Sequence, residues 1–213
     1  MHIPDGVLAP AVWATLDVGS AGIVALAARK AQRALEPKDV SSMAVLTAFI
    51  FAAQMVNFPI GAGVSGHMMG AALAAIIVGL CPAMLMMTTV LVLQALLYGD
   101  GGLMALGANV MNMAIVAPAV GLGAYSVLCR GTSSASLRAA AAGLAAWASV
   151  VVASGCAGAE LILSGFSLEL LFAPLVAVHA VIGIGEAVVT TAALGLVWRT
   201  RPELRPVAWQ VDA

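Results

Sequence analysis

The stretch AALAAIIVGLCPAMLMMTTVLVLQALLY, residues 71–98, decides how this chain folds. Its 28 residues carry no charged side chain, and a helix needs only ~20 apolar residues to cross the hydrocarbon core of a bilayer. Pro82 interrupts the helical pattern, because proline lacks a backbone N–H and its ring clashes with the preceding turn. We therefore predict two helices in a hairpin, separated at Cys81–Pro82 and lying within 66–80 and 83–98.

The rest of the chain contains five further apolar stretches, at 10–28, 41–58, 103–128, 139–163 and 171–198. Of its 213 residues, 62% are hydrophobic and 9% are charged, whereas a soluble domain is ~25% charged. Nine Lys and Arg against ten Asp and Glu leave no basic surface for nucleic acid. The composition predicts an all-α, polytopic membrane protein with seven transmembrane helices.

The basic residues indicate the orientation of these helices, because cytoplasmic loops are enriched in Lys and Arg. With seven spans and an N-terminus outside, all nine basic residues and the C-terminus are cytoplasmic. A single span over 66–98 would place the basic residues that follow it outside, so the pattern favours two spans in this region. The basic residues are Arg29, Lys30, Arg33, Lys38, Arg130, Arg138, Arg199, Arg201 and Arg205.

One integral-membrane domain accounts for residues 1–213. We expect an N-terminal segment at 1–9, the seven-helix bundle at 10–198 and a cytoplasmic tail at 199–213. The first ten residues carry one acid and no Lys or Arg, so they lack the positive start of a secretory signal. No Walker, GxSxG or HExxH motif occurs, so we expect no enzyme activity, and energy for transport must come from a partner or an ion gradient.

Histidine at position 2 has a particular metal chemistry. The free amine of Met1, the backbone nitrogen of His2 and its imidazole can bind one metal through five- and six-membered chelate rings. A nitrogen of His67, in a glycine-rich turn predicted on the same outer side, would complete a planar set of four nitrogens. Such sets suit Ni(II) or Cu(II). The alternatives are that His2 lies on a frayed chain end and that His67 is structural.

Other polar residues lie within apolar stretches. His179 and Glu186 are seven residues apart, so they share a helix face, either as part of a metal pathway or as a structural pair. Four amides either orient His67 and the N-terminal segment or bond between helices: Asn57, Gln94, Asn109 and Asn112. Four acidic residues are predicted on the outer side of the membrane. We interpret them as residues that remain there because Lys and Arg are kept on the cytoplasmic side: Asp5, Asp100, Glu160 and Glu169.

The opening Met1-His2-Ile3-Pro4-Asp5-Gly6 resembles the N-terminal signature of the CbiM/NikM family, the substrate-capture (S) components of energy-coupling-factor transporters for cobalt and nickel. The resemblance covers essentially the whole chain. Further matching motifs are Asn57 to Ile60, Ser65 to Gly70, Leu93 to Gly102, Gly107 to Met113, and His179 to Glu186.

The resemblance implies seven transmembrane helices and an N-terminal segment that folds into the protein and supplies metal ligands. By the family pattern these are the amine of Met1, the backbone and ring nitrogens of His2, and His67. The implied partners are a CbiQ-like membrane scaffold, a CbiO-like cytoplasmic ATPase and a small CbiN-like membrane subunit.

The implied location is the bacterial cytoplasmic membrane, and the implied role is import of Co²⁺ for cobalamin biosynthesis. We favour cobalt because the chain lacks the extra spans of members fused to their accessory subunit, although four planar nitrogens favour Ni²⁺ on chemical grounds. A self-sufficient secondary permease and an intramembrane metalloenzyme are the competing hypotheses.

Overall fold

The computed structural model describes residues 1–61, 63–132 and 134–200. Of the predicted tail at 199–213, only Arg199 and Thr200 belong to the described residues. The described residues contain five helices that are long and apolar enough to cross a membrane. The chain is therefore a mostly helical, multi-pass membrane protein. Among the described residues, fewer than the expected seven helices are long enough to cross the bilayer.

The chain begins with two helices, α1 (Pro10–Ala34) and α2 (Pro37–Gln54). After a β-hairpin come α3 (Ala71–Val78) and α4 (Leu80–Leu93), and α4 continues into the π-helical segment η1 (Gln94–Tyr98). One continuous helix then consists of α5 (Leu106–Val110), the π-helical segment η2 (Met111–Val116) and α6 (Ala117–Leu128). Finally, α7 (Ala135–Leu163) is followed by η3 (Leu168–Phe172) and α8 (Ala173–Thr200).

The predicted helix at 66–80 is only partly present. Its first residues belong to a two-stranded antiparallel sheet of β1 (Asn57–Gly61) and β2 (Val64–His67), in which Asn57 pairs with His67. The remainder, α3, has eight residues and is about 12 Å long, too short to cross ~30 Å of hydrocarbon. A hairpin of five- and four-residue strands is too short to leave a clear hydropathy pattern, so it escapes a prediction based on hydropathy.

The break between α3 and α4 falls at Gly79 rather than at Cys81–Pro82. Gly79 has φ 85°, a left-handed conformation that costs glycine little. Pro82 lies in the first turn of α4, where a residue's N–H has no partner within the helix anyway. The prediction of two helices is therefore confirmed, but glycine and not proline separates them.

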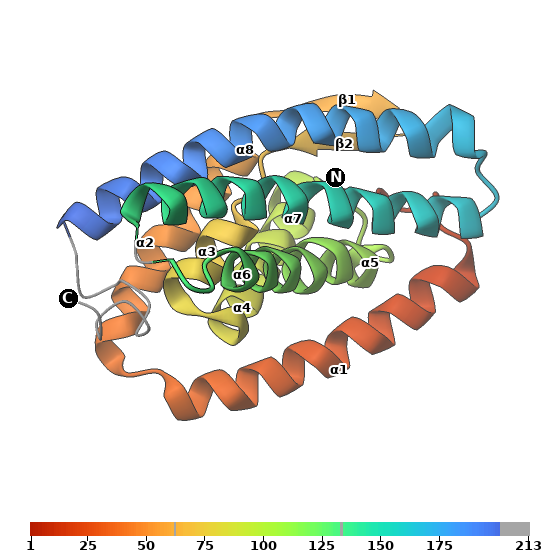
Figure 1. Ribbon diagram of the computed structural model, residues 1–213. Helices are drawn as coiled ribbons and strands as arrows, with labels where there is room; N and C mark the ends of the chain where they lie inside the picture. Colours follow the sequence, from red (N-terminus) through yellow and green to blue (C-terminus); the bar gives the residue numbers. More distant parts are fainter. Residues whose placement is uncertain (62, 133, 201–213) are drawn as a thin grey trace.

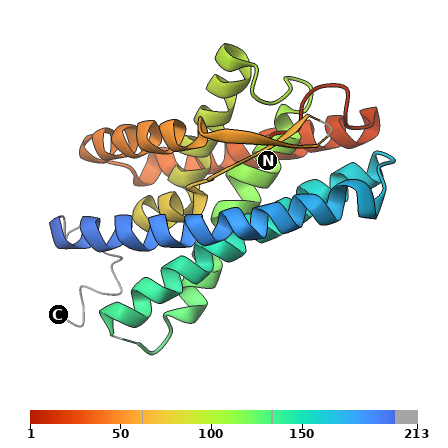
Figure 2. The same cartoon turned by 90° about the horizontal axis from the view of Figure 1, so that it is seen from above.

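The long helices α1, α7 and α8 lie lengthwise along the molecule (Figures 1 and 2). The start of α1 lies beside the turn after α7, where the Ala9 N–H donates to Ser164 Oγ at 3.0 Å. The ends of α1 and α8 and the start of α7 lie together at the opposite end in Figure 1. Arg29, Arg138 and Arg199 are near these three helix ends, so described basic residues gather at one end of the bundle.

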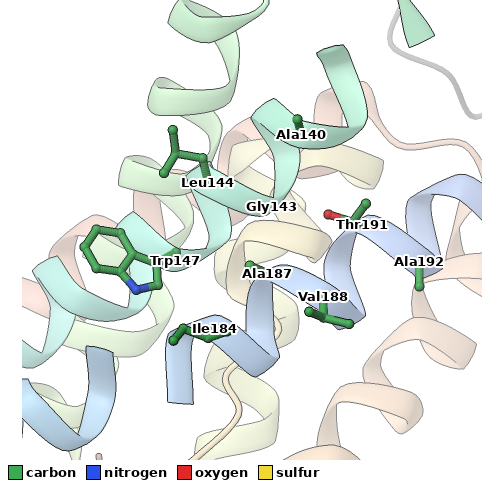
Figure 3. Close-up of a pocket in the computed structure, with 9 residues that line it drawn as sticks. All are labelled: Ala140, Gly143, Leu144, Trp147, Ile184, Ala187, Val188, Thr191 and Ala192. Carbon is green, nitrogen blue, oxygen red and sulfur yellow. The ribbon is translucent and has the colours of Figure 1, made fainter. Parts of the chain in front are cut away.

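Small residues allow α7 and α8 to pack closely. A Cβ atom on Gly143 would lie 2.7 Å from Thr191 Oγ1, and one on Gly183 would lie 2.9 Å from Trp147 Cδ1. Figure 3 shows Gly143, Trp147 and Thr191 around the apolar groove between the two helices, whose lining residues include no titratable side chain. This groove is therefore unsuited to hold a metal ion.

Candidate metal centre

The N-terminal segment is part of the protein core. Met1 is 1% exposed, His2 2% and Ile3 0%. Asn109 holds the backbone of Ile3 from both sides: the Ile3 N–H donates to Asn109 Oδ1 at 2.8 Å, and Asn109 Nδ2 donates to the Ile3 carbonyl at 3.0 Å. The Gly102 N–H donates to the same carbonyl at 2.9 Å. The first three residues are therefore held in one position by α5 and the loop before it.

Asp5 fixes the next part of the segment. Its carboxylate accepts hydrogen bonds from three successive backbone N–H groups, those of Leu103 at 3.0 Å, Met104 at 2.7 Å and Ala105 at 3.1 Å. A Cβ atom at Gly102 would lie 2.1 Å from Asp5 Oδ1. The loop before α5 thus approaches the segment so closely that position 102 requires glycine.

The ring of His2 is held so that one particular nitrogen remains available. Its Nε2 lies 3.0 Å from Gln94 Oε1, which can only accept a hydrogen bond, so Nε2 carries the proton and Nδ1 carries a lone pair. Asp100 Oδ1 lies 3.3 Å from this Nδ1, and Asn57 Nδ2 donates to the other Asp100 oxygen at 2.8 Å. Nδ1 is the nitrogen that closes a six-membered chelate ring with the backbone nitrogen of His2.

His67 lies directly against His2, with the two rings stacked at a centroid distance of 4.6 Å and an interplanar angle of 30°. Its Nδ1 donates to the Met68 carbonyl at 2.7 Å, which leaves a lone pair on Nε2. This Nε2 is buried and has no hydrogen-bond partner among the described residues. The amine of Met1 donates to the carbonyl of Ser65 on the same strand, so the chain start and His67 share one site.

Burial keeps these nitrogens neutral. Burial lowers the pKa of the Met1 amine from 8.0 to about 4, against the opposing effect of Asp100. Burial and the neighbouring Met1 amine lower the pKa of His2 from 6.5 to about 3. The pKa of His67 is also well below 6.5, because of burial and then the nearby Met1 amine, His2 and His179. At neutral pH these nitrogens therefore carry lone pairs, the form in which amines and imidazoles bind metals.

This donor set differs from a cluster of acidic and thiol side chains. The described residues contain no group of three or more His, Cys, Asp and Glu side chains placed to hold a metal. The candidate centre uses main-chain nitrogens as well, since Met1 and His2 contribute the amine and a backbone nitrogen beside the two imidazoles. Nitrogen donors of this kind suit late divalent metals.

The other predicted residues lie at differing distances from this centre. Asn109 contacts the N-terminal segment directly, and Asn57 reaches it through Asp100. Asn112 does not contact the segment: it donates to Glu160 at 2.8 Å, and Glu160 is buried at 7% exposure.

His179 and Glu186 do not bond to each other. His179 Nδ1 donates to the Leu175 carbonyl at 2.8 Å, whereas the Glu186 carboxylate accepts from the Met69 and Gly70 N–H groups at 2.7 and 2.5 Å. Glu186 thereby ties the residues that follow His67 to α8.

Sequence reasoning missed the roles of Asp100 and Asp5. Both were interpreted as outer acids left behind by the sorting of positive charge, yet Asp100 lies beside His2 and Asp5 anchors the segment. One available signal was the pair of glycines after Asp100, since adjacent glycines mark places where another part of the chain approaches closely.

Apolar helices around a buried, nitrogen-rich chain start are features of a membrane protein that handles metal ions. The comparisons with known proteins make this specific. The chain belongs to the CbiM family: residues 2–204 match the model described as the cobalt uptake substrate-specific transmembrane region. It is therefore a component of cobalt or nickel transport and not an enzyme.

Some relatives are named for nickel and others for cobalt. The chain is 34% identical over 225 residues to the fused nickel transport protein NikMN of Rhodobacter capsulatus, covering 96% of this chain and 63% of that protein. It is 36% identical over 132 residues to the cobalt transport protein CbiM of Acetohalobium arabaticum, covering 60% of this chain and 52% of the relative. A crystal structure of a truncated transition metal transporter superimposes with a TM-score of 0.87 at 32% identity, covering 94% of this chain and 99% of that one.

Proposed function

We propose that this chain is the metal-binding membrane subunit of an ATP-driven importer, and that it binds one divalent cobalt ion as its substrate. The ligands are the amine of Met1, the backbone nitrogen and Nδ1 of His2, and Nε2 of His67. The observation that carries this proposal is the burial of the Met1 amine beside two stacked imidazoles whose remaining nitrogens carry lone pairs.

Asp100 adds an electrostatic argument for a cation. Its carboxylate oxygen lies 3.3 Å from Nδ1 of His2, which burial keeps unprotonated at neutral pH. A lone pair and a carboxylate oxygen repel each other at this distance, and a divalent cation bound to Nδ1 reverses the sign of that interaction.

Nickel is the second candidate substrate. Four nitrogen donors that include a backbone amide favour a planar arrangement, which Ni²⁺ prefers. The matching family model is described by cobalt uptake, whereas one of the relatives is named for nickel. Competition between the two ions on purified protein decides the matter: cobalt retained against equimolar nickel supports cobalt, and its displacement makes the chain a nickel-binding subunit.

We propose partners and a location on the basis of the family. The partners are a CbiQ-like scaffold, a CbiO-like ATPase and a small CbiN-like subunit in a bacterial cytoplasmic membrane, and the imported cobalt serves cobalamin biosynthesis. In this arrangement seven helices cross or enter the bilayer, with the N-terminus outside and the C-terminus cytoplasmic. Transport by this chain alone in liposomes would instead show a secondary permease.

Extending the chain tests the ligand set. One alanine placed before Met1 moves the amine away from His2 and leaves an amide nitrogen in its place, and the enclosed site has no room for the added residue because Met1 is 1% exposed. We expect metal affinity, measured by calorimetry, to fall at least a hundredfold. The same alanine added after Ala213 is the control and should leave the affinity unchanged.

Mass spectrometry must show a free amine on Met1 in the unextended protein. Full affinity in the N-terminally extended protein would refute the proposed chelate. His67→Ala, with its imidazole removed, should weaken binding similarly if His67 supplies the fourth nitrogen.

A further inference from the structure

His179 is a buried imidazole whose properties match those of the two proposed histidine ligands. It is 0% exposed on α8. Its Nδ1 donates to the Leu175 carbonyl at 2.8 Å, so Nε2 carries a lone pair, and this Nε2 has no hydrogen-bond partner among the described residues. A buried polar nitrogen without a partner is energetically costly, which makes a purely structural role a poor explanation.

His67 is a neighbour of both His179 and the chain start, and the Met1 amine is also an electrostatic neighbour of His179. One neighbour of His67 is His2, with the rings stacked at 4.6 Å, and its electrostatic neighbours also include His179. The residues after His67 are fixed to α8, because the Met69 and Gly70 N–H groups donate to Glu186. The face of α8 that carries both His179 and Glu186 therefore packs along the backbone that leads away from His67.

His179 also lies deep along its helix. It follows the start of η3, Leu168, by 11 residues, which corresponds to about 16 Å along the helical axis. The start of η3 is at the same end of the bundle as the start of α1. His179 is thus displaced from that end toward the middle of the bundle.

We propose that His67 and His179 form a second metal position, beside the N-terminal chelate, through which the ion leaves that chelate. The proposal rests on the proposed function above. The transfer is a ligand exchange without redox change: Nε2 of His179 bonds to the ion while the Met1 and His2 nitrogens release it, and the His2 amide regains its proton from solvent. His67 stays bound throughout.

A separate position fits the structure better than a fifth ligand in the first site. The described residues contain no cluster of three His, Cys, Asp or Glu side chains, so His2, His67 and His179 are not gathered around one point. His67 is the member that neighbours both of the others, which is the geometry required for handing over an ion in steps.

The first experiment separates capture from transfer. We expect His179→Asn to bind the first metal ion with an affinity within threefold of the unmodified protein, but to lower transport by the complete transporter at least tenfold. Thr190→Val is the matched control, since Thr190 is also polar and buried on α8 at 1% exposure, and it should transport normally. Unchanged transport in His179→Asn, or a large loss of its first-site affinity, would overturn the proposal.

The second experiment needs no transport. The His2→Ala protein lacks the imidazole of the chelate, and at millimolar Co²⁺ it should still bind one ion, visible in the ligand-field absorption spectrum. Adding either His179→Asn or His67→Ala to that protein should abolish the spectrum. Absence of the spectrum before either substitution, or its persistence after them, would overturn the second position. Absence of Co²⁺ and Ni²⁺ binding by the unmodified protein would instead refute the proposed function.

Discussion

Asn109 provides a quantitative test of how the N-terminal segment is held. Replacing it by alanine removes both hydrogen bonds to Ile3, those from the Ile3 N–H and to the Ile3 carbonyl. The carbonyl keeps the bond from the Gly102 N–H at 2.9 Å. The Ile3 N–H is left buried without an acceptor, because Ile3 is 0% exposed.

The expected cost follows from these two losses. A neutral hydrogen bond contributes about 1 kcal/mol, and an unsatisfied buried donor costs about 1–3 kcal/mol. The free energy of docking should therefore fall by about 2–4 kcal/mol, equivalent to about 30- to 700-fold in the docking equilibrium at 1.4 kcal/mol per factor of ten.

Amide hydrogen exchange of residues 1–8 in metal-free protein measures this equilibrium directly. Asn112→Ala is the matched control, since Asn112 lies three residues along the same continuous helix but donates to Glu160. Exchange of residues 1–8 should accelerate in Asn109→Ala and stay unchanged in the control. Equal exchange in both variants would show that the Asn109 amide does not hold the segment, and the reasoning would be wrong.

Two further outcomes follow from the same site. Gly102→Ala places a Cβ atom 2.1 Å from Asp5 Oδ1, so we expect lower thermal stability and at least tenfold weaker metal binding, whereas Gly123→Ala, with no atom within 4 Å of its Cβ position, should change neither. Docking should also weaken as the pH falls, because the pKa values of the Met1 amine and of His2 drop from 8.0 and 6.5 to about 4 and about 3 on burial. The undocked segment therefore binds more protons below pH 8, and the protection of residues 1–8 from exchange should fall by about two powers of ten between pH 8 and 6; rising protection over that range would contradict the burial of neutral nitrogens.

Hydropathy and charge predicted much of the fold. Apolar stretches located the long helices because the bilayer admits few other structures. The hairpin of β1 and β2 was not predicted, since the glycines around residues 64–67 indicated a turn and not a strand. The helix break was assigned to Pro82 and not to Gly79. From sequence alone, a proline in the first turn of a helix cannot be told from one that breaks a helix.

The site was predictable as far as its residue types carried chemistry. His2 and His67 were selected because imidazole binds metals, and the structure stacks their rings at 4.6 Å. The partners that orient them were harder to assign. Asn109 and Asn112 are equivalent by sequence spacing, and only the path of the chain decides that one contacts Ile3 and the other Glu160.

The long sequence separation of these contacts has a consequence for biosynthesis. The Ile3 backbone can bond to Asn109 only after 106 further residues have been synthesised, and Ala9 can bond to Ser164 only after 155. At about 5–20 residues per second, synthesis leaves the first residues undocked for about 5–30 s. Enzymes that trim or modify a nascent chain have their freest access to the segment during this interval, before the later helices enclose it.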